Sequence, residues 1–241
     1  MLEEAIEAIR RVVPRRVVAF TGAGVSAESG IPTFRGAGGL WRNFRSEDLA
    51  TPEAFARDPE LVWEWYEWRR GLVREAKPNA AHEAIARLGD AGVVVTQNVD
   101  GLHARAGSQD VIELHGNLFR VRCVREGKVR EAFDAFPTIP PRCECGALLR
   151  PDVVWFGEIL PEQALTRASE VMQAADLLLV IGTSGVVYPA AGLVSLHRGL
   201  SIEINPQASG VSSACTYAIP MTAAAATPAI VEAILEEIHA D

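Results

Sequence analysis

The stretch VVAFTGAGVSAESGIPTFRG, residues 17–36, joins a short apolar run to a glycine-rich turn. The run at 17–20 predicts a buried strand, and Gly22 and Gly24 suit a strand-to-helix turn whose backbone can approach a pyrophosphate. The dinucleotide fingerprint G-x-G-x-x-G is not met, because its sixth position is Ala27. No acidic residue ends a second strand about 20 residues later, which argues against an ordinary dehydrogenase. A purely structural tight turn explains G-A-G after a strand equally well.

Apolar runs and helical patterns alternate along the rest of the chain. Further buried strands are predicted at residues 93–98, 111–114, 176–184 and 201–205. Helical spacing of apolar residues marks 2–13, 79–89, 161–174, 189–197 and 227–239. This alternation is typical of a parallel sheet covered on both faces, so we expect an α/β fold. Two stretches, 37–78 and 120–150, break the alternation, and we expect them to form a smaller lobe against the sheet domain.

The composition is that of a globular protein and narrows the possible partners. The chain has 241 residues, of which 49% are hydrophobic and 22% charged, and a formal net charge of -8. This negative charge argues against direct binding to nucleic acids or to anionic membranes, and it mildly favours a basic peptide substrate. The sequence shows neither a secretory signal nor a membrane span, and four cysteines make no disulfide scaffold. We therefore expect a cytoplasmic protein; the sequence leaves the oligomeric state open, and a monomer is compatible with it.

Six motifs resemble those of one protein family, in the family's order and spacing. They are TGAGVSAESGIPTFRG (21–36), TQNVDGLH (96–103), ELHGN (113–117), RPDVVWFGE (150–158), GTS (182–184) and EIN (203–205). Across nearly the whole chain they resemble the sirtuins, which are NAD-dependent protein lysine deacylases. The resemblance implies a Rossmann-like parallel sheet covered by helices, with a small lobe made of a helical insertion and a zinc-ribbon-like insertion. The Rossmann-like NAD-binding domain would comprise residues 1–36, 79–119 and 151–241, and the two insertions 37–78 and 120–150.

The resemblance also implies a reaction and its catalytic residues. In the family the acyl oxygen attacks C1′ of the nicotinamide ribose, nicotinamide leaves, and the acyl group of the lysine ends on ADP-ribose. His115 would be the general base that deprotonates a ribose hydroxyl. Asp100 would hold the nicotinamide carboxamide, and Asn98 would order the ribose and a water. Without the motifs, His115 reads as a capping or core histidine and N-x-D as a capping turn, while His82 and His103 match no catalytic position.

The NAD contacts implied by the resemblance lie at the ends of several predicted strands. Phe34 would shield the reacting face of the ribose, and Arg35 would lie near the phosphates. The second half of the nucleotide would meet Thr183, Ser184 and Asn205. The complete expected set is Gly22, Ala23, Gly24, Glu28, Thr33, Phe34, Arg35, Trp41, Gln97, Asn98, Asp100, Gly182, Thr183, Ser184 and Asn205.

Two further segments are expected to contact an acyl-lysine protein or peptide substrate. The run Val154, Trp155, Phe156 and Gly157 resembles the strand that pairs with the substrate backbone, and its Trp and Phe would line a tunnel for the lysine methylenes. A core strand is the alternative interpretation. In VWEWYEWRR, Tyr66 and Arg69 share a helix face and resemble the Tyr-x-x-Arg pair of sirtuins that remove succinyl or malonyl groups. A solvated arginine beside a packed tyrosine would explain this pair as well.

Three of the four cysteines cluster where the family carries a zinc ribbon built from two C-x-x-C pairs. Here Cys123 stands alone, with Glu126 where its partner cysteine would fall, and the second pair is contracted to Cys143-x-Cys145. This excludes a complete set of four thiolates, and the contracted pair is expected to be poorly spaced for one ion. We expect a ribbon that has lost its metal and is held by packing of Val121, Phe133, Phe136 and Ile139. A three-thiolate zinc site completed by Glu126 or water is the alternative.

Two other functions remain compatible with the sequence. A protein ADP-ribosyltransferase or an NAD glycohydrolase would use the same site with another nucleophile. A non-catalytic module that binds NAD or acyl-lysine is a third possibility, although such a module would have little need of His115, Asn98 and Asp100 together.

Overall fold

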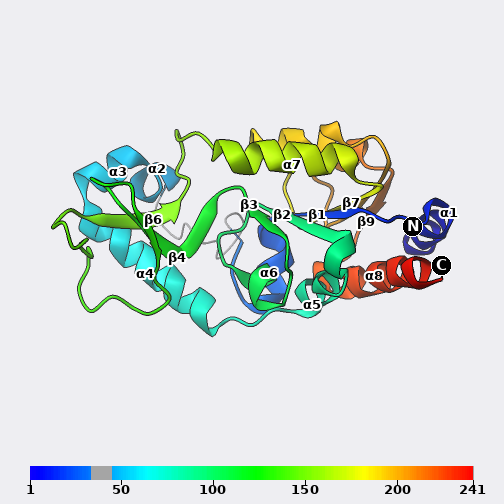
Figure 1. Ribbon diagram of the computed structural model, residues 1–241, viewed down its shortest axis with the longest axis horizontal. Helices are drawn as coiled ribbons and strands as arrows, with labels where there is room; N and C mark the ends of the chain where they lie inside the picture. The colour runs from blue at the N-terminus through cyan, green and yellow to red at the C-terminus, as the bar shows by residue number, and fades with distance from the viewer. Residues whose placement is uncertain (34–44, 241) are drawn as a thin grey trace.

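A computed structural model of the protein describes residues 1–33 and 45–240 (Figure 1). Within these residues the strands form a six-stranded sheet and a separate three-stranded sheet. The larger sheet runs β3-β2-β1-β7-β8-β9, and every neighbouring pair is parallel. Its strands are β1 (Val17–Thr21), β2 (Gly92–Thr96), β3 (Val111–Glu113), β7 (Leu177–Ile181), β8 (Leu200–Ile204) and β9 (Tyr217–Ile219). The expected α/β fold and its five predicted strands are confirmed; β9 was not predicted.

Alternate residues of the central strands enter two separate hydrophobic cores, as the two-residue period of a strand requires. Val17 and Ala19 of β1 pack with one set of helices, and Val18 and Phe20 pack with another. The first set comprises α1 (Leu2–Val12), α5 (Ala80–Ala86) and α8 (Ala223–His239). The second comprises α7 (Glu162–Ala174) and the 3₁₀ helix η3 (Ala190–Leu196). In Figure 1, α7 and α8 accordingly lie on opposite sides of the sheet.

The smaller lobe combines helices and an antiparallel sheet in one core. Its helices are α2 (Ser46–Leu49), α3 (Pro52–Arg57) and α4 (Pro59–Glu75), and its strands are β4 (Gly116–Cys123), β5 (Val129–Glu131) and β6 (Leu149–Val153). The strands are ordered β5-β4-β6. Trp63 of α4 packs in the same core as Val121 of β4 and Leu149 of β6. Segments far apart in the sequence therefore form this lobe together, while the residue boundaries of the lobes stay a prediction.

Arg70 on α4 ties this helix to the ribbon segment. Its side chain is fully buried and donates to the carbonyls of Leu118, Ala132 and Asp134, at 2.6, 2.5 and 2.7 Å. Its Nε donates to Glu67 at 2.9 Å. Backbone carbonyls at a loop need partners when they are buried, and one guanidinium supplies several here.

No helix in the described part of the chain is both long enough and apolar enough to cross a membrane.

Replacing Arg70 with Met should strongly destabilise the protein. The change leaves the buried carbonyl of Leu118 and the part-buried carbonyls of Ala132 and Asp134 without donors. An unpaired buried group costs about 1–3 kcal/mol, so we expect the free energy of unfolding to fall by about 3 kcal/mol. Urea denaturation would measure the loss. Arg74→Met is the matched control on the same helix, because Arg74 is only partly buried and makes fewer such bonds. Equal losses in the two variants would contradict the role of Arg70.

Candidate active site at the carboxyl edge of the parallel sheet

The glycine-rich turn after β1 meets a second glycine turn after β7. Gly22 N–H donates to Ile181 O at 3.0 Å, and Gly24 N–H donates to Gly182 O at 2.8 Å. A Cβ on Gly24 would lie 2.7 Å from the Gly182 Cα, so this approach requires the glycine. The chain places β2 and β3 on one side of β1 and β7 to β9 on the other. The contact therefore marks the point where strand order reverses, which is where such sheets bind ligands.

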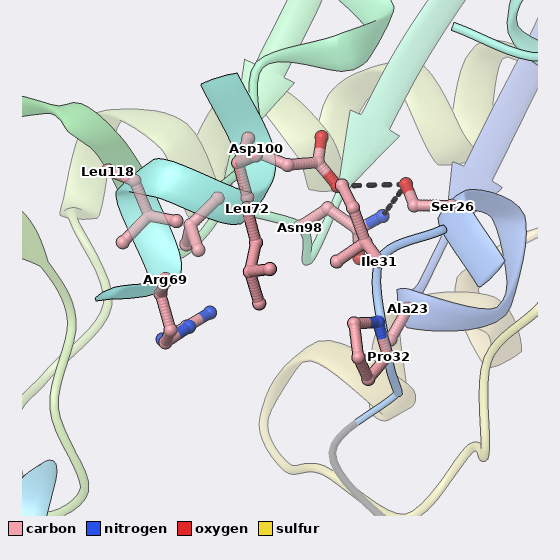
Figure 2. A pocket seen from close by; sticks show the side chains of 11 residues that line it. Ala23, Ser26, Ile31, Pro32, Arg69, Leu72, Asn98, Asp100 and Leu118 are labelled. Carbon is pink, nitrogen blue, oxygen red and sulfur yellow. Dashed lines mark hydrogen bonds between the residues drawn. The ribbon is translucent and has the colours of Figure 1, made fainter. Parts of the chain in front are cut away.

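A pocket lies beside this turn and reaches across to helix α4 (Figure 2). The turn continues into a 3₁₀ helix, η1 (Ala23–Ser29), rather than directly into an α-helix. The lining residues are Ala23, Ser26, Ile31, Pro32, Arg69, Leu72, Val73, Asn98, Val99, Asp100 and Leu118. Most are apolar, so the few polar groups among them stand out.

Three polar side chains in the pocket bond to one another. Asn98 Nδ2 donates to Ser26 Oγ at 3.1 Å, and Ser26 Oγ donates to Asp100 Oδ2 at 2.8 Å (Figure 2). The other Asp100 oxygen accepts from Leu102 N–H at 2.9 Å. All three are at most 7% exposed. The structure thus brings together the predicted pair Asn98 and Asp100 and adds Ser26, which the sequence interpretation did not single out.

Two histidines that matched no predicted site position lie directly behind this network. Asn79 N–H donates to His82 Nδ1, which leaves the His82 hydrogen on Nε2, 3.3 Å from Ser26 Oγ. His103 Nε2 lies 2.9 Å from Thr21 Oγ1, and the two imidazole rings are 4.8 Å apart. Burial lowers the pKa of both rings, to about 3 for His103. The sequence does not mark His82 as a residue next to the site, because His82 also forms the capping box of α5 together with Asn79.

His115 lies in the turn between β3 and β4, with one ring nitrogen fixed. Its Nδ1 is 3.0 Å from the Gln97 carbonyl, so Nδ1 carries the hydrogen and Nε2 keeps a lone pair. Burial lowers the pKa of His115, although the bond to Gln97 opposes this. The ring is therefore neutral at pH 7 and able to accept a proton.

The ends of β7 and β8 contribute further predicted residues to the same edge. Gln97 Nε2 donates to Thr183 Oγ1 at 3.0 Å, and Asn205 Nδ2 donates to Thr183 O at 2.9 Å. Ser184 is exposed next to them. These bonds join the ends of β2, β7 and β8 across the point where strand order reverses.

Some predicted NAD contacts are not found at the pocket. Glu28 accepts from Thr222 Oγ1 at 3.0 Å and from Ala224 N–H at 2.8 Å, so it caps the start of α8 instead of lining the pocket. Phe34, Arg35 and Trp41 lie outside the described residues, and Thr33 is the last described residue before them.

Of the predicted acyl-binding pair, Arg69 lines the α4 side of the pocket, whereas Tyr66 is buried and is not among the lining residues. The Arg69 guanidinium sits 4.6 Å from the Trp65 ring and 5.6 Å from the Tyr66 ring, and it lines the pocket (Figure 2). The Tyr66 hydroxyl accepts from Trp155 Nε1 at 2.9 Å. Burial lowers the pKa of Arg69 and raises that of Tyr66, so the Tyr66 hydroxyl keeps its proton at neutral pH.

The expected extended run from Val154 to Gly157 is wrong. Strand β6 ends at Val153, and Glu158 N–H donates to Trp155 O in a turn. The Glu158 carboxylate accepts from both Trp155 N–H and Arg150, and this folds the chain back. Trp155 is 3% exposed, with the Arg150 guanidinium 3.4 Å from its ring, whereas Phe156 is 54% exposed.

The expected poor spacing of the cysteine cluster is also wrong. Donor atoms of Cys123, Glu126, Cys143 and Cys145 all lie within 4.8 Å of one another. The packing expected of the ribbon is only partly seen. Val121 is fully buried and Phe136 and Ile139 are partly so, whereas Phe133 is 48% exposed.

The buried His103 should make stability depend on pH. The folded protein keeps it neutral down to a pKa of about 3, but an unfolded chain protonates it below its ordinary value of 6.5. The contribution of neutral His103 to the free energy of unfolding is therefore intact above pH 6.5 and is lost as the pH falls towards 3. At pH 5 this loss amounts to about 2 kcal/mol. We expect His103→Gln to remove that part of the pH dependence in unfolding measurements between pH 8 and 4. The exposed His239→Gln is the control, and unchanged pH dependence in His103→Gln would contradict the assignment.

Known proteins resemble this chain in both sequence and structure. The Sir2 family model matches residues 22–189. NAD-dependent protein deacylase 2 of Pyrobaculum aerophilum is 52% identical over 232 residues, which cover 93% of each chain. An NAD-dependent protein deacylase of Aquifex aeolicus is 56% identical over 79% of this chain and 83% of its own. A Sir2 homologue solved with ADP-ribose superposes with a TM-score of 0.92 at 46% identity, covering 100% of this chain and 99% of that one.

These likenesses extend over the glycine turn, the Asn98–Asp100 pair and His115, whose geometry is described above. The protein therefore belongs to the Sir2 family and is an enzyme of the NAD-dependent protein deacylase kind.

Proposed function

We propose that this deacylase removes succinyl and malonyl groups from lysine as well as acetyl groups, releasing nicotinamide and O-acyl-ADP-ribose. The observation that carries the acyl preference is the Arg69 guanidinium, which lines a pocket of mainly apolar side chains next to Asn98 and Asp100. Arg69 is 6% exposed, and Leu72, Val73 and Leu118 surround the same space. In such a surrounding an arginine fork binds a carboxylate more strongly than it would in water.

The aromatic contacts of Arg69 hold its guanidinium in one orientation. Stacking on Trp65 restrains the guanidinium plane, so less side-chain freedom is lost when a carboxylate binds. Tyr66 accepts its hydrogen bond from Trp155 and so keeps its own hydroxyl hydrogen for another acceptor. An acidic acyl group in the pocket would thus meet the Arg69 guanidinium, whereas an acetyl group would occupy the same space without using that charge.

The residues at the sheet edge fit a bound dinucleotide. Gly22 and Gly24 allow close backbone approach, and Gln97, Thr183 and Asn205 form one connected polar edge. NAD supplies a ribose carbon that can release nicotinamide and accept the acyl oxygen. We assign Asn98 and Asp100 to the nicotinamide end, where Ser26 fixes both, and His115 to proton removal at Nε2.

The substrate backbone is proposed to bind beside the turn after β6. Phe156 and Gly157 are exposed there, and the Val154 N–H donates to His115 O, which ties this segment to the catalytic turn. The net charge of -8 favours acyl-lysines in basic peptide segments.

Replacing Arg69 with Met should lower the activity on acidic acyl groups selectively. A charge-assisted pair is worth about 1.5–3 kcal/mol, so we expect kcat/KM on a succinyl-lysine peptide to fall by about 10- to 150-fold. Deacetylation of the same peptide should change by less than about threefold, because an acetyl group has no carboxylate to bind. Mass spectrometry of the products gives both rates. Arg74→Met, on the same helix, should leave both activities intact, and equal succinyl activity in Arg69→Met and the wild type would refute the assignment.

Replacing His115 with Asn should stop turnover while NAD still binds. The Asn amide can still donate to Gln97 O but cannot take up a proton, and loss of a general base typically costs about 10²–10⁴ in rate. Calorimetric titration with NAD would check binding, and O-acyl-ADP-ribose formation would check turnover. Nicotinamide release by the wild type without O-acyl-ADP-ribose would instead indicate a glycohydrolase or ADP-ribosyltransferase.

A further inference from the structure

His115 lies in the short turn between β3 and β4, where the chain leaves the parallel sheet and enters the smaller lobe (Figure 1). Leu114 before it is fully buried, and the Leu114 N–H donates to Thr96 O at 2.9 Å. Gly116 after it has a φ of 79°, and a Cβ there would lie 2.1 Å from Asp152 O, so the turn can end against β6 only with glycine. The position of His115 therefore depends on a short backbone segment.

A hydrogen bond between two side chains spans this turn. Asn117 Nδ2 donates to Glu113 Oε1 at 2.6 Å, so the bond joins the two ends of residues 114–116. The amide oxygen of Asn117 accepts from Phe119 N–H at 2.8 Å, which assigns the donor and acceptor ends of the amide. The Glu113 side chain is 16% exposed. A hydrogen bond to a carboxylate is roughly twice as strong as one between neutral groups.

Charged neighbours hold the Glu113 carboxylate in place. Its second oxygen, Oε2, lies 2.8 Å from Arg120 Nη2. Arg120 also donates to Asp152 Oδ2 at 3.2 Å, and Arg122 donates to Asp152 Oδ1 at 2.7 Å. These side chains alternate in charge; Glu113 belongs to the parallel sheet and the others to the antiparallel sheet. Both oxygens of Glu113 are thus engaged, which fixes the acceptor for Asn117.

Asn117 also contacts the segment that carries Asp100. A Cβ on Gly101 would lie 3.4 Å from Asn117 Nδ2, so the amide packs against this glycine. Next along β4, the Leu118 N–H donates to Val99 O at 2.8 Å. The Asn117 amide therefore lies between this segment and the turn from β3 to β4, the two parts of the chain to which the proposed chemistry is assigned.

A general base needs an accurate position more than a strong bond. It must lie within about 2.6–3.2 Å of the group whose proton it takes. The bond from His115 Nδ1 to Gln97 O fixes the tautomer, but the ring still moves whenever its backbone segment moves. A misplacement of about 1 Å can cost about 10²-fold in rate. The bond between Asn117 and Glu113 restrains this segment at both of its ends.

We propose that Asn117 and Glu113 are positioning residues for the reaction, and that their hydrogen bond holds the turn so that His115 Nε2 faces the ribose hydroxyl. The inference rests on the proposed function, in which His115 removes a proton from that hydroxyl. Because both residues act through His115, they should affect only the steps that need a base. Departure of nicotinamide comes before those steps.

Asn117→Asp tests the bond with an isosteric change. The new carboxylate keeps an acceptor for Phe119 N–H but turns an oxygen towards Glu113, so the bond is lost and like charges repel. With an acetyl-lysine peptide, we expect kcat for O-acyl-ADP-ribose formation to fall by about 10- to 100-fold. Exchange of isotope-labelled nicotinamide into NAD should change by less than about threefold, because nicotinamide leaves and returns before the base acts.

A double variant, Glu113→Gln with Asn117→Asp, should recover most of the lost rate. The exchanged pair restores the bond with donor and acceptor reversed, and the new amide oxygen can still accept from Arg120. Asp110→Asn is the matched control at the opposite end of β3. It removes a carboxylate that accepts from Arg167 at 2.7 Å, and it should leave both rates unchanged.

Three results would overturn the proposal: unchanged O-acyl-ADP-ribose formation in Asn117→Asp, an equal fall in nicotinamide exchange, or a double variant no faster than the single one. An equal fall would indicate a merely structural role. If thermal melting shows that Asn117→Asp does not fold, Glu113→Gln alone takes its place, because its one carbonyl oxygen cannot serve both donors as the carboxylate does. Unchanged product formation in that variant would equally overturn the proposal.

His115→Asn separates failure of this inference from failure of the proposed function. Turnover that survives in His115→Asn would remove the base assignment itself, and the inference with it. Turnover that is lost in His115→Asn but kept in Asn117→Asp would leave the base in place and refute only the positioning role.

Discussion

Two glycine turns touch through their backbones where β1 and β7 end, and the rest of the active site depends on this contact. Gly24 N–H donates to Gly182 O, and a side chain on Gly24 would meet the Gly182 backbone at 2.7 Å. Because the strands are parallel, their carboxyl ends lie at one edge of the sheet, and the glycine contact joins the turns that follow β1 and β7 at that edge. Asn98 after β2, His115 after β3 and Asn205 after β8 then lie along this same edge of the sheet.

Two neutral imidazoles, those of His82 and His103, lie beside the Asp100 carboxylate at this pocket. Ser26 accepts from Asn98 and His82 and donates to Asp100, so its hydroxyl uses every bonding position it has. Burial lowers the pKa of His82 and of His103, so neither ring adds a positive charge beside Asp100 at neutral pH. Arg69 lines the same pocket from helix α4. Asp100 and Arg69 therefore place opposite charges on two sides of the pocket.

The sequence predicted the sheet well because its central strands are continuous apolar runs, buried along their whole length. It missed β9, whose three residues lie at the sheet edge and carry no periodic signal. The sequence predicts a strand in place of the turn after β6 because VVW is apolar and begins with two β-branched residues. The Arg150–Glu158 pair, which folds the chain back, joins side chains eight residues apart and leaves no local apolar pattern. The spacing of Cys143 and Cys145 was misjudged for a related reason. Local sequence describes a crowded pair, and only the fold brings Glu126 and Cys123 to it.

Helix α4 contacts both the pocket and the ribbon segment through two consecutive residues. Arg69 and Arg70 point in directions about 100° apart, as successive residues on a helix do. Arg69 lines the pocket, and Arg70 holds the carbonyls of residues 132 and 134 in the ribbon segment. One helix therefore contacts the pocket and the ribbon segment through adjacent side chains. The backbone contacts that join the glycine turns after β1 and β7 are made within the parallel sheet instead.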